Sequence, residues 1–194
     1  MSKSTIIGAG EYDNVFALLE AFHRGAAEAS MSLYFGCFHR DGRFLGTDAQ
    51  ENWHVNEFYD WTQPIFKTGE GWIFRPIEKS RKVTYFPSEA NPTFCIFDEL
   101  LESEQFKATS RGSGTLVFNP DKKTWLIGQY HLSFPVPNDI TMVVTKKIAT
   151  FETTLKEVAA AEAARRLLEE WDLEDKKPAN PPTNNQGKKS GRKK

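Results

Sequence analysis

Four side chains of this sequence have the chemistry to move a proton: Asp48, Asp98, Glu99 and His131. Two of them are neighbours in the segment FDEL at 97–100, inside an apolar run. Successive side chains of a strand point to opposite faces, so at most one of these carboxylates should line a cavity. A buried carboxyl group has a raised pKa unless it is paired, which suits a general base or a neutral donor. Alternatively, one carboxylate is solvated and the other forms an ion pair with Arg111 or a surface lysine.

Arg111, Gln129 and His131 belong to two strand-like runs that an Asn-Pro-Asp turn joins. In the second run, alternation places on one face Trp125, Ile127, Gln129, His131 and Ser133. This face is apolar at one end and polar at the other, as the wall of a ligand cavity would be. An imidazole there could transfer a proton, and a guanidinium could bind a carboxylate or a phosphate. Alternatively, the histidine is hydrogen-bonded at a sheet or dimer surface and Arg111 forms a structural ion pair.

Aromatic residues recur at helical spacing at Trp53, Phe58 and Trp61, and they could form a wall or lid of such a cavity. The alternative is that they belong to the core. The remaining histidines show no HxH or HExxH spacing, so we expect no metal site. We expect no cofactor either, because the glycine pair at 8–10 lacks the third glycine of a dinucleotide fingerprint.

The composition predicts one globular domain with appendages. The 194 residues include fifteen Phe and five Trp, which suits a sheet around an apolar interior. Cys37 and Cys95 form no CxxC pair, as expected for reduced core residues of a cytoplasmic protein. No apolar run suggests a signal peptide, and none reaches the roughly 20 residues of a membrane span.

The net charge of −1 is unevenly distributed. Residues 176–194 hold seven Lys or Arg and no acid, so the rest of the chain carries about eight excess negative charges. This acidity argues against nucleic-acid binding by the folded part. We expect the basic tail to be disordered. It could bind nucleic acid weakly, direct nuclear entry, or only keep the protein soluble.

Helices followed by strands, which is typical of an α+β domain, should position these residues. The patterns predict helices near 14–26, 30–38 and 53–67, a short strand at 43–46, and a meander of strands at 72–86, 93–102, 106–118 and 124–134. Pro64 should kink the third helix or end it early. A long helix should begin at Asn138, with an apolar stripe that continues to Trp171. We expect its distal half to pack on a partner, as in a coiled coil.

Several words of the sequence together resemble the SnoaL-like branch of the nuclear transport factor 2-like superfamily: FLGTD at 44–48 with Glu51 and Trp53, FDEL at 97–100, RGSGTLVF at 111–118 and WLIGQYHLSFPVPND at 125–139. The resemblance implies a cone-shaped α+β fold, in which a curved antiparallel sheet wraps around N-terminal helices and encloses a pocket, often as a dimer. We therefore expect an N-terminal arm at 1–11, a SnoaL-like domain at 12–152, a helical extension at 153–175 and a disordered basic tail at 176–194. The last strand also resembles the association domain of calmodulin-dependent kinase II, an oligomerisation module.

In isomerases of this superfamily, a carboxylate near the end of the first strand shuttles the proton. An ungapped placement puts Gly46 at that position, with Asp48 two residues further along the same nominal face. Tyr34 could act as an oxyanion donor if its hydroxyl points inward. The alternative for Asp48 is a cap of the turn before the third helix.

Two functions remain as alternatives, since fold membership fixes no reaction. In the first, a homodimeric module binds a small hydrophobic ligand or serves assembly, and the ligand contacts Tyr34, Trp53, Phe58, Trp61, Arg111, Gln129 and His131. In the second, an isomerase-, dehydratase- or cyclase-like enzyme acts by proton transfer on a hydrophobic carbonyl compound, with a base among Asp48, Asp98, Glu99 and His131.

Overall fold

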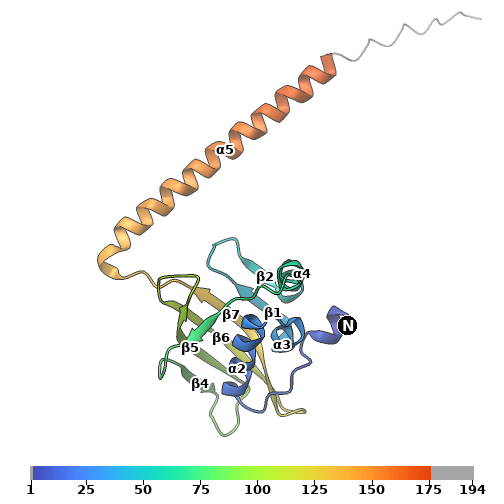
Figure 1. Ribbon diagram of the computed structural model, residues 1–194, viewed down its shortest axis with the longest axis vertical. Helices are drawn as coiled ribbons and strands as arrows, with labels where there is room; N and C mark the ends of the chain where they lie inside the picture. Colours follow the sequence, from blue (N-terminus) through green and yellow to red (C-terminus); the bar gives the residue numbers. More distant parts are fainter. Residues whose placement is uncertain (1, 176–194) are drawn as a thin grey trace, which may run out of the picture. The chain divides into compact units, whose positions relative to one another are not determined.

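The computed structural model describes residues 2–175 and divides into two units, with the boundary between Pro135 and Val136 (Figure 1). The predicted disorder of residues 176–194 lies outside the described residues. The first unit contains, in chain order, α1 (Lys3–Ile6), α2 (Val15–Ala27), α3 (Met31–Gly36), β1 (Phe38–Leu45), β2 (Asn52–His54), α4 (Val55–Phe66), β3 (Phe74–Pro76), β4 (Lys82–Phe86), β5 (Phe94–Ser103), β6 (Ser110–Asn119) and β7 (Thr124–Ser133). The α+β class predicted from the sequence is confirmed.

Helices α2 and α3 begin where a side chain satisfies one of their first free N–H groups. Asn14 caps α2, because its side chain accepts a hydrogen bond from the backbone N–H of Ala17 at 2.8 Å. Ser30 caps α3 in the same way. In α4, Pro64 lies within the last turn and the helix ends two residues later, consistent with a proline that stops a helix early.

The strands form one seven-stranded sheet with the order β2-β1-β7-β6-β5-β3, and β4 pairs with another part of β5. All neighbours are antiparallel except β1 and β7, which run parallel. The sheet is therefore mixed, whereas the family resemblance implied an antiparallel sheet. Hairpin turns impose antiparallel pairing on consecutive strands. No such turn joins β1 and β7, which lie far apart in the sequence.

The run at 72–86, predicted as one strand, is two strands that pair with different parts of β5. A turn separates them: the N–H of Ser80 binds the carbonyl of Ile77, and Lys79 has a positive φ of 61°. β2 was not predicted. It pairs with β1 across the loop that carries Thr47 and Glu51.

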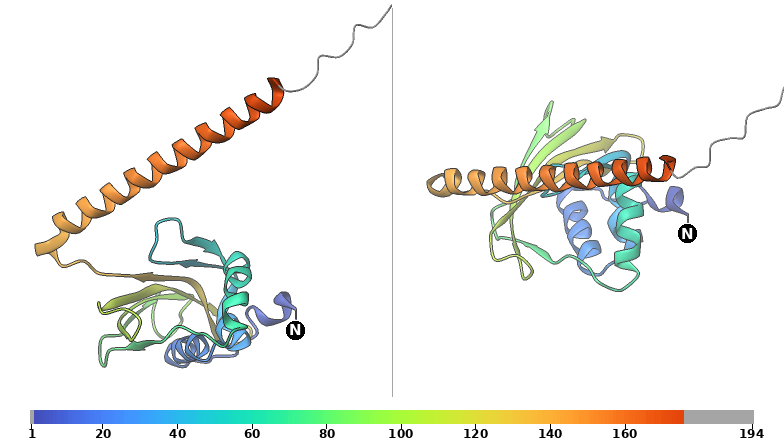
Figure 2. Two further views of the ribbon diagram at one scale, coloured as in Figure 1. Left: turned by 45° about the horizontal axis from the view of Figure 1, so that its top comes forward. Right: turned by 90° about the horizontal axis from the view of Figure 1, so that it is seen from above.

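The curved sheet covers the helices with its inner face (Figure 2). Fully buried rings from α3, β1 and α4 meet in the core, for example Phe35, Phe38 and Phe58. Their centroids lie 5.5 to 6.2 Å apart with tilted or edge-to-face planes, which favours aromatic packing. Phe58 of this core also lines the cavity between the helices and the sheet.

The second unit contains a 3₁₀ turn (Asn138–Ile140) and then one long helix, α5 (Thr141–Asp175). The long helix was predicted, with its start at Asn138. Its exposed apolar residues keep a spacing of three and four at Ile148, Phe151, Leu155 and Val158. Beyond Val158, apolar residues continue at steps of three and four at Ala161, Ala164, Leu168 and Trp171. None of the helices within residues 2–175 combines the length and apolar character that a membrane crossing requires.

Candidate functional site

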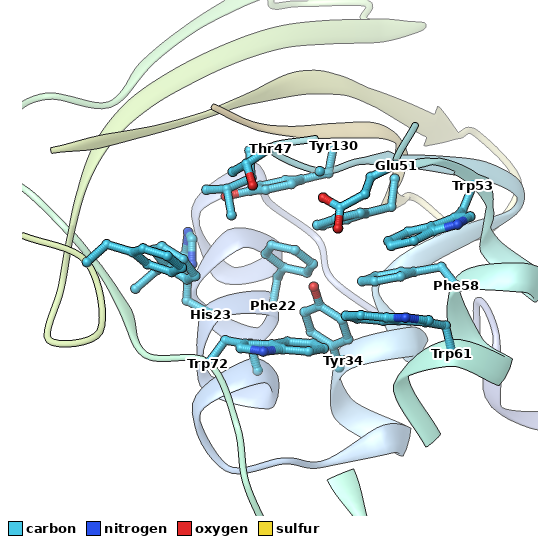
Figure 3. A pocket seen from close by; sticks show the side chains of 16 residues that line it. Phe22, His23, Tyr34, Thr47, Glu51, Trp53, Phe58, Trp61, Trp72 and Tyr130 are labelled. Atoms are coloured by element: carbon cyan, nitrogen blue, oxygen red, sulfur yellow. The ribbon is translucent and has the colours of Figure 1, made fainter. Parts of the chain in front are cut away.

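A cavity of about 130 Å³ lies between the helices and the inner face of the sheet (Figure 3). Ten of its sixteen lining residues are aromatic, one is a carboxylate, and none is Lys or Arg. The lining residues are Phe22, His23, Ala26, Tyr34, Phe44, Gly46, Thr47, Glu51, Trp53, Phe58, Trp61, Trp72, Phe74, Phe106, Tyr130 and Leu132. They come from α2, α3, β1, β2, α4, β3 and β7 and from the loops that carry Gly46, Thr47, Glu51, Trp72 and Phe106. The composition suits an apolar guest that is oriented by a few polar groups.

Three tryptophans form one side of the cavity. The ring centroids of Trp53 and Trp61 lie 4.9 Å apart, and those of Trp61 and Trp72 lie 5.8 Å apart with an interplanar angle of 15°. The planes are therefore nearly aligned, and Trp53 stacks on Trp61. Trp61 remains 44% exposed although it lies beside the apolar core. The indole surface around the cavity is thus only partly covered by the protein itself.

Glu51 and Tyr34 bring oxygen atoms to the cavity from opposite sides (Figure 3). The Glu51 carboxylate accepts a hydrogen bond from the N–H of Asp48 at 3.2 Å. It has no ion-pair partner within residues 2–175. Tyr34 is buried, and burial raises the pKa of its phenol well above the usual value. Its hydroxyl therefore stays protonated and can donate a hydrogen bond to a guest.

The Glu51 carboxylate occupies the space into which a side chain at position 46 would project. A Cβ built on Gly46 would overlap Glu51 Oε2. The expected carboxylate position at the end of β1 therefore holds a glycine, and a carboxylate reaches the same place from the loop that follows. The fold thus delivers an acidic group to the cavity without an acidic residue at 46.

His23, at the cavity wall, belongs to a buried charged network. Its Nε2 lies 2.6 Å from Glu99 Oε1, and the Nε of Arg81 donates to Glu99 Oε2 at 2.7 Å. Burial alone would raise the pKa of Glu99, but the hydrogen bond from His23 and the charges of His23 and Arg81 outweigh it, so the pKa lies below its ordinary value. Arg81 also reaches Glu20 through Nη1 at 3.2 Å. Because the ionised carboxylate can only accept, His23 Nε2 carries a proton, which fixes the orientation of the ring.

The sequence matches the SnoaL-like domain family over residues 15–137. The chain belongs to this family. No curated protein matches the chain. Among solved structures, a nuclear transport factor 2-like protein of unknown function from Pseudomonas putida has a TM-score of 0.51 and 9% identity, and the match covers 71% of this chain and 92% of that chain. A protein of the same superfamily from Streptomyces avermitilis, proposed to be a dehydratase, has a TM-score of 0.50 and 10% identity, with coverage of 63% and 94%. At these identities the likeness concerns the fold alone.

The SnoaL-like domain brings four of the predicted ligand-binding residues to the cavity: Tyr34, Trp53, Phe58 and Trp61. The other three, Arg111, Gln129 and His131, lie on the outer face of the sheet. There His131 pairs with Ser113, which pairs with Asp98, so two predicted site residues, Asp98 and His131, lie in one row across three strands. This row is on the opposite side of the sheet from the cavity.

A β-bulge in β7 explains why Gln129 and His131 lie on the outer face of the sheet and not in the cavity. Thr115 pairs with Gln129 but Leu116 pairs with Ile127, so Gly128 is an extra residue on β7. A bulge shifts the alternation by one residue. Trp125 and Ile127 face the core before the bulge, whereas Tyr130 and Leu132 do so after it. Gln129 and His131 are thereby turned outward.

The predicted carboxylates are placed apart from one another. Asp98 and Glu99 point to opposite faces as expected, and the buried one, Glu99, pairs with Arg81 rather than with Arg111. Asp48 is exposed and its carboxylate accepts a hydrogen bond from the N–H of Gln50, which is the capping role considered as the alternative. Within residues 2–175, no three His, Cys, Asp or Glu side chains gather as they would around a metal ion.

Sequence reasoning missed Glu51, His23 and Trp72 as lining residues. His23 gave one usable signal, because it lies on the buried side of α2 beside Leu19, Phe22 and Ala26. Glu51 and Trp72 lie outside regular periodic segments, where no repeat indicates the direction of a side chain.

Proposed function

We propose that this SnoaL-like domain binds a small, largely apolar molecule in the aromatic cavity. The observation that carries the proposal is the partly exposed row of tryptophans beside Glu51 and Tyr34. Burial of apolar surface is favourable by roughly 25 cal/mol for each Å² removed from water, and part of the indole surface here remains in water. A guest that covers the row recovers this free energy, and the oxygen atoms of Glu51 and Tyr34 orient it.

The proposal is tested by ligand-observed NMR with indole and cyclohexanone as probes. Saturable binding is expected in the wild type and should be lost in Trp61→Ala. Trp171→Ala is the matched control, because Trp171 is an exposed tryptophan of α5 that does not line the cavity. Equal binding by both variants, or no binding by the wild type, would refute the proposal.

A second candidate function is proton transfer on a hydrophobic carbonyl compound. It is favoured by the pair of His23 and Glu99, in which a buried carboxylate orients an imidazole at the cavity wall. The second nitrogen of His23 or the Glu51 carboxylate would take the proton, and the Tyr34 hydroxyl would stabilise the enolate. None of the four bases predicted from the sequence, Asp48, Asp98, Glu99 and His131, lines the cavity, and Glu99 contacts it only through His23.

This candidate predicts turnover within a panel of cyclic ketones, epoxides and polyketides. Removing a general base typically costs about 10²–10⁴-fold in rate, so Glu51→Gln or His23→Gln should reduce turnover by that order. His131→Gln is the control on the outer face and should retain activity. Absence of turnover across the panel, together with retained ligand binding, would leave the binding function alone.

We also propose that the outer face of the sheet supports a homodimer. Phe94 and Ile96 of β5 are exposed on this face, at 38% and 45%, and Phe86 of β4 stacks on Phe94 with centroids 5.0 Å apart. Apolar side chains on an exposed sheet face, next to the polar row of Asp98, Ser113 and His131, suit a self-complementary contact.

A further inference from the structure

We propose that the ligand of the cavity is an organic cation, such as an amine or a quaternary ammonium group. This inference rests on the proposed binding function and specifies its chemical class. It follows from the placement of a single carboxylate, Glu51, opposite the indole faces of Trp61 and Trp72 (Figure 3). Aromatic faces attract cations through their quadrupole, and tryptophan is the strongest partner.

Glu51 brings a negative charge to the cavity lining, and no lysine or arginine of the lining within residues 2–175 opposes it. Glu51 is half-buried and accepts only one hydrogen bond, from the N–H of Asp48, so most of its lone pairs are available to a guest. No Lys or Arg belongs to the described lining. An anionic guest would meet an uncompensated carboxylate, whereas a cation would pair with it.

The arginine of the buried network behind His23 already has acidic partners. Arg81 is bound by Glu99 at 2.7 Å and by Glu20 at 3.2 Å, and Glu99 also binds His23 at 2.6 Å. This network has its own acidic partners and therefore does not compensate Glu51. The positive charge that would balance the Glu51 carboxylate must therefore come from solvent ions or from the guest.

A cationic guest would also account for the solvent exposure of the tryptophan rings. Trp61 and Trp72 have nearly parallel planes, and the Glu51 carboxylate and the Thr47 hydroxyl point toward the cavity from the other side. A compact cationic head would contact the ring faces below and the carboxylate above. The small cavity, about 130 Å³, suits a head group of this kind better than an extended ligand.

The experiment compares choline with its neutral carbon isostere, 3,3-dimethylbutan-1-ol, which has the same shape without the charge. Binding to the full chain is followed by the quenching of tryptophan fluorescence and by calorimetry. We expect choline to bind about tenfold or more tightly than the isostere. Glu51→Gln should remove this preference, and Trp61→Leu should weaken choline binding by a similar factor. Asp48→Asn is the matched control, because its carboxylate is exposed and outside the lining.

The outcomes separate this inference from the proposed function. Equal affinity for the two isosteres, or a preference that survives in Glu51→Gln, overturns the cationic ligand. Binding of indole without any binding of choline overturns it as well, while the apolar binding function stands. If neither choline nor indole binds, both proposals fall. Loss of the preference in Asp48→Asn would place the charge recognition outside the cavity and would also overturn the inference.

Discussion

The imidazole of His23 and the carboxylate of Glu99 meet at 2.6 Å inside the domain, 76 residues apart in the sequence. Glu99 is fully buried and its second oxygen binds Arg81. One residue of the cavity wall is thus held by a charged network in the core. The network links the stability of the fold to the position of His23.

Glu99→Gln should destabilise the domain by about 3–5 kcal/mol, the usual cost of removing one partner from a buried ion pair. Arg81 would keep its charge without its main buried partner. The free energy of unfolding from urea denaturation measures this effect. Glu102→Gln on the same strand is the control and should change it little, because Glu102 is exposed. Equal stability of both variants would show that the network contributes nothing.

The same carboxylate should make the wild type sensitive to acid. Its pKa in the folded state is lowered, with burial opposed by the stronger effects of His23 and Arg81. The stabilisation is therefore complete above the unfolded-state pKa of about 4.3 and is lost as the pH falls through the lower folded-state value. Unfolding free energies between neutral pH and acid should fall less steeply in Glu99→Gln than in the wild type. Parallel curves would contradict the assignment.

Substitutions at two glycines should have different consequences. In Gly46→Ala, the new methyl group overlaps the Glu51 carboxylate, which can swing away. We expect modest destabilisation and weaker binding in the cavity. In Gly114→Ala, the methyl group overlaps the backbone carbonyl of Gln129, so the pairing of β6 with β7 must yield. This should cost about 1–3 kcal/mol. Thermal unfolding and NMR binding assays distinguish the two effects; unchanged binding in Gly46→Ala would separate Glu51 from the site.

The two thiols should be unreactive in the folded protein. Burial raises the pKa of Cys37 and of Cys95 to about 12, and the thiolate is the reactive form. A colorimetric thiol reagent at about pH 8 should therefore label neither residue until the chain unfolds. The control is the same reaction in denaturant, where both should react. Rapid labelling of one native thiol would indicate an opening of the core around it.

The proposed dimer should depend on the outer sheet face. Ile96→Lys places a charge in the exposed apolar patch and should convert dimers to monomers in sedimentation equilibrium. Val136→Lys changes an exposed apolar residue outside the sheet and serves as the control. Leu155→Lys tests the apolar stripe of α5 instead. Dissociation by Leu155→Lys alone would transfer the contact from the sheet to the helix.

The sequence alone determined the elements that rest on local rules. The helical spacing of apolar residues along α2, the proline in α4 and the alternation along β5 all predicted structure correctly, because they depend on neighbours a few residues away. The family resemblance rested on short words with fixed spacing and was confirmed over residues 15–137. The division of Asp98 and Glu99 between two faces follows from strand geometry in the same way.

Only the tertiary structure decided which side chains share the cavity. The bulge at Gly128 depends on how β7 pairs with β6 and β1, and it reverses the faces of Gln129 and His131. The partner of Glu99 is Arg81 rather than Arg111, because β5 and α2 bring a loop arginine and a helix histidine to one carboxylate. Pairing across long stretches of chain is set by the packing of the whole sheet, and no local pattern encodes it.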